Sequence, residues 1–350
     1  MAMSAERVVV AMSGGVDSSL AAAILKDEGY RVIGVTMRLQ AESGVVERAR
    51  RVAKRLAIPH YVADFRDIFS RMVITDFCRQ YSRGRTPNPC IRCNHHIKFG
   101  ALLNKAKELG VAFLATGHYA RVARSANGYR LLKAVDPGKD QSYFLYILGQ
   151  RQLEYLLLPI GNLHKPEVRE MASDLGLTAA QSRESQDICF IPASDYRSFI
   201  TEHIPLKPGD IVDTEGRLLG RHKGLALHTV GQRQGLGLTS ARRLYILRLE
   251  VNSNRLVVAD HDRLLSRRLR AGRLNWVSGR APTDDGNITA RIRYRAPEVA
   301  VRLHIKNGTA QVQFDQPQRA VAPGQAVVFY QGEAVLGGGI IEPSNQYEEG

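Results

Sequence analysis

The chain has few cysteines for its length, and this scarcity limits how it can be held together. Four occur among 350 residues, at Cys78, Cys90, Cys93 and Cys189. Small secreted domains that depend on disulfides carry a much denser set, so a disulfide framework is excluded. Free thiols in a reducing compartment fit better, and we expect a cytoplasmic protein whose cysteines are available for chemistry.

Long hydrophobic runs and an N-terminal signal are also missing. No apolar stretch reaches the roughly 20 residues that a membrane span needs, and residues 1–7 lead straight into a strand-like segment. Acidic residues are scarce too, because 49 Lys and Arg exceed 34 Asp and Glu by 15. These absences argue against a membrane protein. The basic excess favours a polyanionic partner, most simply nucleic acid, although a generally basic surface would give the same count.

The first motif, S-G-G-V-D-S at residues 13–18, joins an apolar, β-branched run at 7–12 to a helix-forming run at 19–25. Its two glycines let the backbone approach an anion closely. The helix that follows offers free N–H groups and the positive end of its dipole. The motif therefore predicts a phosphate cradle, although it is neither a Walker A loop nor a G-x-G-x-x-G fingerprint.

Strand-length apolar runs alternate with helical patterns through the first half of the chain. We expect strands at residues 7–12, 31–37, 60–64 and 111–116, and helices at 45–56, 65–81, 97–109 and 165–175. This alternation predicts an α/β fold with a doubly wound parallel sheet. Ligands bind such sheets at the carboxyl ends of the strands, where Met37 and Gly117 fall.

After about residue 204 the pattern changes to short strands separated by Gly or Asn turns. Strands are expected at 208–213, 244–250, 255–259, 288–294, 299–305 and 326–330. We therefore predict three domains, at residues 1–204, 205–270 and 271–350: the α/β domain, a small β domain and a β-barrel. We also expect the first domain to fold without the others. Residues 241–295 contain thirteen Arg, no Lys and five acids, which favours an RNA-binding surface over a merely solvated basic face.

The segment 81–94 contains two prolines, a glycine and two asparagines, and we expect a loop there. Within it Cys90 and Cys93 form a C-x-x-C pair. The nearby cations Arg83, Arg85, Arg92 and Lys98 are expected to lower the pKa values of these thiols. Cys189 has polar neighbours, which weigh against burial, whereas Cys78 follows Phe77 in a helical stretch and reads as an inert thiol.

The segment at residues 13–18 resembles the pyrophosphate loop (PP-loop) of the ATP pyrophosphatases, which adenylate a carbonyl oxygen and release pyrophosphate. Four further segments are similar to motifs of the tRNA-specific 2-thiouridylases, the MnmA family. They are G-R-T-P-N-P with C-N and I-K-F at 84–99, K-D-Q-S-Y at 139–143, S-Q-D-x-C-F at 185–190 and T-x-G-Q-R-x-G-L-G at 229–237. The resemblance spans essentially the whole chain. It implies an adenine nucleotide α-hydrolase-like fold and ATP-dependent 2-thiolation of the wobble uridine of tRNA.

The resemblance also implies which residues act. Residues that would contact ATP are Ala11, Met12, Ser13, Gly14, Gly15, Val16, Asp17, Ser18, Met37 and Gly117. Asp17 is expected to be catalytic and to help hold Mg²⁺, which prefers carboxylate and phosphate oxygens. Residues that would contact tRNA are His118, Lys139, Asp140, Gln141, Arg293, Tyr294 and Gln325. The expected partners are tRNA and either a sulfur-donor protein or sulfide.

Two sulfur routes remain open. In the persulfide route Cys189 carries the transferable sulfur and Cys93 resolves the persulfide, forming a Cys93–Cys189 disulfide. In the cluster route Cys90, Cys93 and Cys189 hold a 4Fe–4S cluster whose fourth iron binds sulfide. Many family members carry Asp where this chain has Cys90, and this departure is what raises the cluster route. A structural Zn²⁺ site is a weaker option.

Two functions of other classes are also compatible with parts of the sequence. An amidotransferase-type synthetase could use the same phosphate loop on a small-molecule carbonyl, but it leaves the thiols and the basic β half unexplained. A purely RNA-binding protein would not need the loop. Pyrophosphate exchange that depends on tRNA separates these functions.

Overall fold

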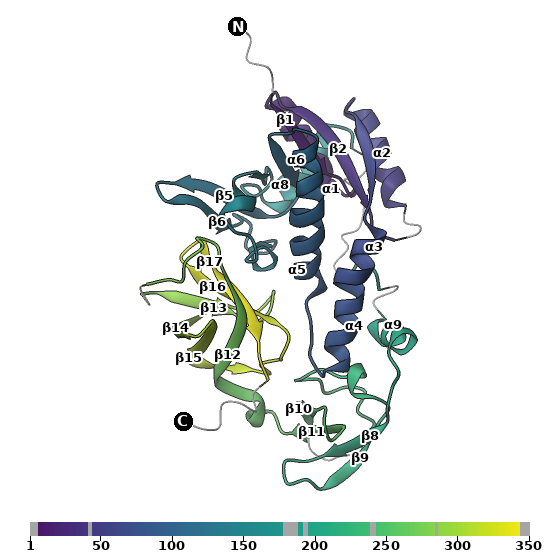
Figure 1. Cartoon of the computed structure of the whole chain (residues 1–350), viewed down its shortest axis with the longest axis vertical. Helices are drawn as coiled ribbons and strands as arrows, with labels where there is room; N and C mark the ends of the chain where they lie inside the picture. The colour runs from purple at the N-terminus through teal and green to yellow at the C-terminus, as the bar shows by residue number, and fades with distance from the viewer. Residues whose placement is uncertain are drawn as a thin grey trace.

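The computed structural model describes residues 6–40, 44–177, 188–191, 195–238, 243–283 and 286–343. It contains an N-terminal domain built on a parallel sheet, a small middle sheet and a C-terminal barrel. The barrel lies beside the helices α4 and α5 of the N-terminal domain, and the middle sheet lies at the far end from the parallel sheet (Figure 1). No helix among the described residues is both long and apolar enough to cross a membrane.

The parallel sheet has the strand order β3-β2-β1-β4-β7, and every pairing in it is parallel. Its strands are β1 (Arg7–Ala11), β2 (Arg31–Arg38), β3 (His60–Asp64), β4 (Phe113–Thr116) and β7 (Leu156–Leu157). Helices that alternate with these strands are α1 (Val16–Asp27), α2 (Val45–Arg55), α6 (Leu103–Glu108) and α7 (Gln150–Leu153), and α8 (Lys165–Asp174) follows the last strand. The predicted α/β fold is confirmed.

Alternate residues of β1 face opposite layers of helices. Val8 and Val10 belong to a core cluster that also contains side chains of α1, α2 and α8. Val9 and Ala11 belong to another cluster, which includes Phe99 and Leu102 of the helix before β4. Since successive side chains of a strand point to opposite faces, the sheet is covered on both sides, as a doubly wound fold requires.

Two long helices leave the sheet toward the middle domain. The first consists of α3 (Arg66–Phe69), a π-helical stretch (Ser70–Ile74) and α4 (Thr75–Ser82); the second of α5 (Pro89–Cys93), a π-helical stretch (Asn94–Leu102) and α6. The loop predicted for residues 81–94 is therefore wrong over its second half. Pro89 occupies the first turn of α5, and the Asn88 side chain accepts hydrogen bonds from the backbone N–H groups of Cys90 (3.1 Å) and Ile91 (3.3 Å). Proline in the first turn and asparagine at the N-cap favour a helix start.

The middle domain begins with α9 (Tyr196–His203) and contains a four-stranded sheet in the order β10-β11-β8-β9. These strands are β8 (Gly209–Val212), β9 (Leu218–His222), β10 (Tyr245–Glu250) and β11 (Arg255–Ala259). Three strands coincide with predicted ones, and β9 was missed.

The barrel consists of six strands, closed by the pairing of β12 with β17. They are β12 (Leu265–Trp276), β13 (Ile288–Arg291), β14 (Val299–Lys306), β15 (Thr309–Arg319), β16 (Ala326–Gln331) and β17 (Ala334–Ile341). The sequence predicted β13, β14 and β16 and missed the other three. A hairpin of the N-terminal domain, β5 (Ala120–Ser125) and β6 (Gly128–Lys133), also joins this sheet where Leu132 pairs with Ala334.

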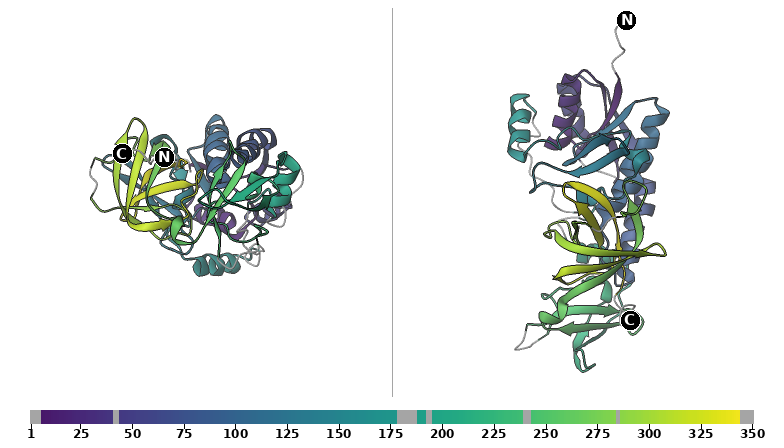
Figure 2. Two further views of the ribbon diagram at one scale, coloured as in Figure 1. Left: turned by 90° about the horizontal axis from the view of Figure 1, so that it is seen from below. Right: turned by 90° about the vertical axis from the view of Figure 1, so that its left-hand side faces the viewer.

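The N-terminal domain and the barrel share one hydrophobic core. A single cluster of buried side chains contains Val9, Phe99 and Tyr143 together with Val328 and Tyr330 of the barrel. Figure 2 shows the barrel seated against one side of the N-terminal domain. The barrel is therefore packed as part of the same core rather than attached by a linker.

Candidate functional site

The loop after β1 is braced by its own serines. Gly14 has a φ of +69°, and a Cβ there would lie 2.5 Å from Cβ of Arg48 in α2. The Ser13 N–H donates to Oγ of Ser18 (3.1 Å), and the Ser19 hydroxyl donates to the carbonyl of Gly15 (2.8 Å). Ser13 is exposed, Gly15 is half-buried and α1 begins at Val16, so the loop and the helix N-terminus are open to an anion.

Asp17 faces the same cavity as the loop, and its carboxylate is fixed by two hydrogen bonds. Its Oδ1 accepts hydrogen bonds from the Tyr119 hydroxyl (2.8 Å) and from Nζ of Lys165 (2.6 Å). The Lys165 side chain is buried, whereas a third of the Asp17 side chain is exposed. Neither contact uses Oδ2, so the carboxylate keeps an oxygen suited to a cation such as Mg²⁺.

The loop and the cysteines line one cavity of about 440 Å³. It lies at the carboxyl ends of β1, β2 and β4, where a doubly wound sheet binds its ligands. The predicted site residues that line it are Ala11, Met12, Ser13, Asp17, Ser18, Met37, Cys90, Cys93, Gly117, His118, Gln141 and Cys189. Gly14, Gly15 and Val16 belong to the adjoining loop and helix start. A Cβ at Gly117 would lie 2.6 Å from the backbone of Asp17 and Ser18, so this glycine lets β4 approach the loop.

The thiols do not have the lowered pKa values that the sequence predicted. Burial raises the pKa of Cys93 to about 12, and the opposing charge of Lys98 does not overcome it. Burial likewise raises the pKa values of Cys90 and Cys189, although both open onto the cavity. Among the cations that were expected to help, Arg92 is paired with Asp76 instead (3.1 Å). The three thiols are therefore protonated at neutral pH in this form of the protein.

His118 lies at the end of β4 and is buried. Its Nδ1 is 2.7 Å from the Thr116 hydroxyl and its Nε2 is 3.3 Å from Nζ of Lys98. Burial, with a smaller contribution from Lys98, holds the pKa of His118 well below its ordinary value. The ring is neutral at pH 7 and can exchange hydrogen bonds but supplies no positive charge for a phosphate.

The three predicted contacts at residues 139–141 differ in exposure. Gln141 lines the cavity, and its Oε1 accepts a hydrogen bond from the Tyr119 N–H (3.1 Å). Lys139 is half-buried. Asp140 is only 3 % exposed, and its carboxylate accepts hydrogen bonds from Ser142 and, across the domain junction, from Arg291 (3.0 Å). Since Arg291 also pairs with Glu298 (2.7 Å), Asp140 anchors the barrel and its side chain is not open to RNA.

The three predicted barrel contacts lie near the junction with the N-terminal domain. The Tyr294 ring is 4.4 Å, centroid to centroid, from Phe144, which lines the cavity. The Arg293 guanidinium donates to the backbone carbonyls of Arg319 and Ala320, and burial lowers its pKa. Gln325 donates from Nε2 to the Thr86 carbonyl (3.1 Å). Of the three, Tyr294 contacts a residue that lines the cavity.

Cys90, Cys93 and Cys189 share the cavity as free thiols. Nevertheless, nowhere in the described ranges do three or more His, Cys, Asp or Glu side chains come together closely enough to hold a metal ion. Within the described residues, therefore, no complete ligand set for a cluster or a Zn²⁺ ion is present. Ser185, Gln186 and Asp187, which were expected to keep Cys189 exposed, lie outside the described residues.

Sequence reasoning did not identify Lys165 and Tyr119 as site residues. Lys165 is the first residue of α8 and lies 148 positions after Asp17 in the sequence. The packing of α8 on α1 brings the two side chains together. The position of Lys165 was the available indication in the sequence. A lysine at the start of a helix interacts unfavourably with the helix dipole, so its presence there suggests a role in the site.

Comparison with known proteins shows the family of the chain. Three family models match successive parts of the chain: a tRNA methyl transferase HUP domain over residues 6–193, a tRNA methyl transferase PRC-barrel domain over 197–260 and an aminomethyltransferase β-barrel domain over 266–341. The tRNA-specific 2-thiouridylase MnmA of Moorella thermoacetica is 49 % identical, covering 95 % of this chain and 99 % of its own. That of Dehalococcoides mccartyi is 46 % identical, covering 96 % and 97 %. With its phosphate loop, its cysteines and its three successive domains, the chain belongs to the tRNA-specific 2-thiouridylase family.

Proposed function

We propose that the protein is an ATP-dependent enzyme that replaces the C2 oxygen of a tRNA wobble uridine by sulfur. The observation that carries this proposal is the single cavity shared by the phosphate loop, Asp17 and the pair Cys93 and Cys189. Adenylation modifies O2 and the sulfur then attacks C2 of the same base, so both sets of groups need to reach one base. A base within a stack cannot enter such a cavity, so the target nucleotide is flipped out of its stack.

In the first step the uridine O2 attacks the α-phosphorus of ATP and pyrophosphate leaves. The N3 proton of the base is lost as the C2–O bond becomes single. The loop N–H groups and the dipole of α1 bind the phosphates. Asp17 would hold a Mg²⁺ ion, which neutralises charge on the phosphates when bound, and Lys165 and Tyr119 orient this carboxylate.

In the second step a persulfide on Cys189 attacks C2 with its outer sulfur, and AMP leaves. The Cys93 thiolate then attacks the Cys189 sulfur of the adduct. The bond between the two persulfide sulfurs breaks, 2-thiouridine leaves, and a Cys93–Cys189 disulfide forms that an external thiol must reduce. Because burial raises the pKa of the Cys93 thiol to about 12, its proton must leave with help, and Lys98 is the cation whose charge favours the thiolate.

Sulfur transfer is assigned to the persulfide route, because that route needs only Cys93 and Cys189, and both line the cavity. The sulfur donor of this route is a protein persulfide, which passes its outer sulfur to the Cys189 thiol and itself returns to a thiol. For the RNA, we propose that Gln141 hydrogen-bonds to the uracil edge, since its amide offers both a donor and an acceptor. Tyr294 packs beside the base through its contact with Phe144. Bound tRNA lies along Lys139, Arg293 and Gln325. Asp140 acts by position only, because it is buried.

The test is ATP–pyrophosphate exchange measured with and without unmodified tRNA. We expect exchange only when tRNA is present. Asp17→Ala and Lys165→Met should each abolish it and leave tRNA affinity nearly unchanged, since both residues lie at the phosphate loop. Exchange without tRNA would favour the alternative, a synthetase for a small-molecule carbonyl. Normal turnover by Asp17→Ala would refute the assignment of the loop.

A further inference from the structure

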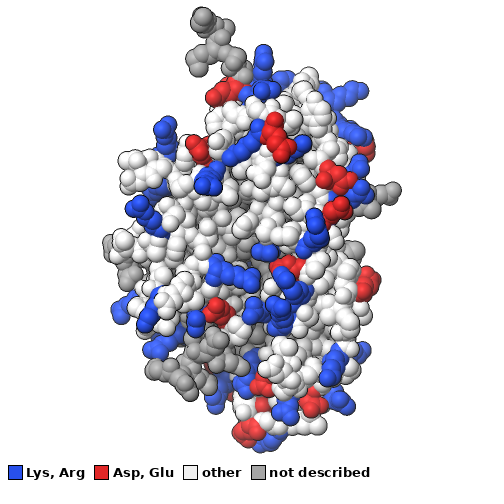
Figure 3. Space-filling model, in the orientation of Figure 1, with Lys and Arg blue, Asp and Glu red and all other residues white. Residues whose placement is uncertain are grey.

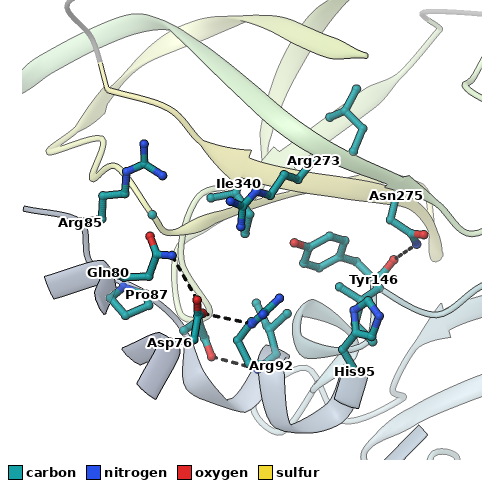
Figure 4. Close-up of a pocket in the computed structure, with 15 residues that line it drawn as sticks. Asp76, Gln80, Arg85, Pro87, Arg92, His95, Tyr146, Arg273, Asn275 and Ile340 are labelled. Atoms are coloured by element: carbon teal, nitrogen blue, oxygen red, sulfur yellow. Dashed lines mark hydrogen bonds and ion pairs between the residues drawn. The ribbon is translucent and has the colours of Figure 1, made fainter. Parts of the chain in front are cut away.

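The helix that carries the cysteines has a second cavity on its other side. Cys90 and Cys93 face the cavity described above, whereas Ile91 and Arg92 line a separate one of about 340 Å³. Its opposite wall is the barrel, which contributes Arg273 on β12 and Ile340 on β17. Figure 4 shows Arg85, Arg92 and Arg273 reaching this space from a loop, a helix and a strand.

The charges around this cavity are unbalanced. Asp76 is the one carboxylate that lines it, and Asp76 is already engaged by Arg79 (2.6 Å) and Arg92 (3.1 Å). Burial works to raise the pKa of Asp76, but these cationic partners outweigh it and hold the pKa below its ordinary value. Neither Arg85 nor Arg273 forms an ion pair with a carboxylate in the described part of the chain. Two guanidinium groups are therefore left without a counter-charge.

Backbone irregularity aims Arg273 into the cavity. The pairing of β12 with β17 shifts register between Gly272 and Asn275, which is a β-bulge, and Arg273 within it has a φ of +51°. Left-handed backbone is uncommon for a residue with a side chain, and bulges often redirect side chains next to functional sites. The Asn275 side chain fixes the bulge by donating to the carbonyls of Tyr146 (2.7 Å) and Leu148 (3.3 Å).

Arg85 is fixed by contacts between its loop and the barrel. The Thr86 N–H donates to the Pro323 carbonyl (2.8 Å), and Gln325 donates to the Thr86 carbonyl (3.1 Å). Arg85 also lines two neighbouring cavities, one of which again includes Arg273 and the other Arg83 and Arg248. Their acidic residues are taken, since Glu342 pairs with Arg270 and Glu250 with Arg248 (3.0 Å each). Lys and Arg gather around the hollow at the middle of this face (Figure 3).

We propose that Arg85 and Arg273 bind a backbone phosphate of the RNA substrate at the junction of the N-terminal domain and the barrel. Planar guanidinium groups match phosphate oxygens bidentately, better than ammonium groups do. This site rests on the proposed function, because it takes tRNA as the substrate. It adds a phosphate contact on the face of α5 that points away from the chemistry, so the cysteine helix is held between the bound backbone and the reacting base.

The test compares the variant Arg85→Gln/Arg273→Gln with the wild-type protein in tRNA binding over a series of salt concentrations. We expect the slope of log affinity against log salt to fall by roughly 1 to 2 and the affinity at low salt to fall roughly tenfold. Arg85→Lys/Arg273→Lys should keep most of the slope, because the charge remains. Arg130→Gln/Arg302→Gln removes two exposed arginines of β6 and β14 that line none of these cavities, and serves as the matched control.

A loss no larger than that of the control would overturn the proposal. So would a loss of ATP affinity with unchanged tRNA binding, because the cavity would then be a nucleotide site. If the thermal unfolding temperature of Arg85→Gln/Arg273→Gln without tRNA equals that of the wild-type protein, a folding defect is excluded. If it differs, the tRNA binding of Arg85→Lys/Arg273→Lys decides the question, because that variant keeps both positive charges. Failure of the wild-type protein to bind tRNA at all would instead refute the proposed function.

Discussion

Cys90 is the residue whose substitution separates the two sulfur routes. We expect Cys90→Ser to keep most thiolation activity, because Cys93 and Cys189 remain in the cavity. Cys93→Ser and Cys189→Ser should each abolish thiolation. Cys78→Ser is the matched control, since Cys78 lies on α4 and does not line the cavity. Activity is measured as 2-thiouridine formed in tRNA, with iron and sulfide assayed on protein prepared without oxygen. Loss of iron and activity together in Cys90→Ser would contradict the persulfide route.

For single residues, the sequence predicted the positions of the phosphate loop and the reactive cysteines better than their charge interactions and pKa values. The motif around residues 13–18 predicted the phosphate loop, because strand, glycine turn and helix follow one another directly in the chain. It could not predict that Arg92 turns to Asp76, that burial raises the pKa of Cys93 or that Lys165 reaches Asp17. Those facts depend on which side chains the fold brings together across long separations.

Among the elements, helix α5 decides how the cysteines are presented. Asn88 caps it with two hydrogen bonds from its first turn. We expect Asn88→Ala to cost about 1 kcal/mol of stability and to reduce thiolation, because Cys90 lies in that first helical turn and Cys93 directly follows it. Asn88→Asp, which keeps the capping oxygen, should restore most of both. Denaturant unfolding and 2-thiouridine formation are the measurements. Equal activity of the alanine and aspartate variants would show that the cap does not position the thiols.

The same helix shows why local rules misplaced its start. Prolines at 87 and 89 favour a loop by local rules, yet Pro89 lies in the first turn of α5, where the N–H that proline lacks needs no partner. The strands that were missed have a comparable reason. The bulge in β12 and the many glycines of β17 interrupt the alternation of apolar residues on which strand prediction depends.

For the whole molecule, the shared core changes what truncation should do. The sequence suggested that residues 1–204 fold alone, but Tyr143 and Phe99 pack in one cluster with Val328 and Tyr330 of the barrel. We now expect the fragment 1–204 to lack a cooperative thermal transition and to bind ATP poorly. Adding residues 205–350 as a second chain should restore both. A fragment that unfolds cooperatively and binds ATP as the full chain does would contradict this expectation.

The pairing of Leu132 with Ala334 also sets an order of events during synthesis. These partners lie 202 residues apart in the chain (334 − 132). At translation rates of roughly 5–20 residues per second, the time between synthesis of β6 and synthesis of its neighbour β17 is on the order of 10–40 seconds. During that interval the growing chain exposes the edge of a hairpin and part of an unfinished core, which is the kind of surface that chaperones bind. Production of this enzyme is therefore most vulnerable to aggregation in the last stage of its own translation.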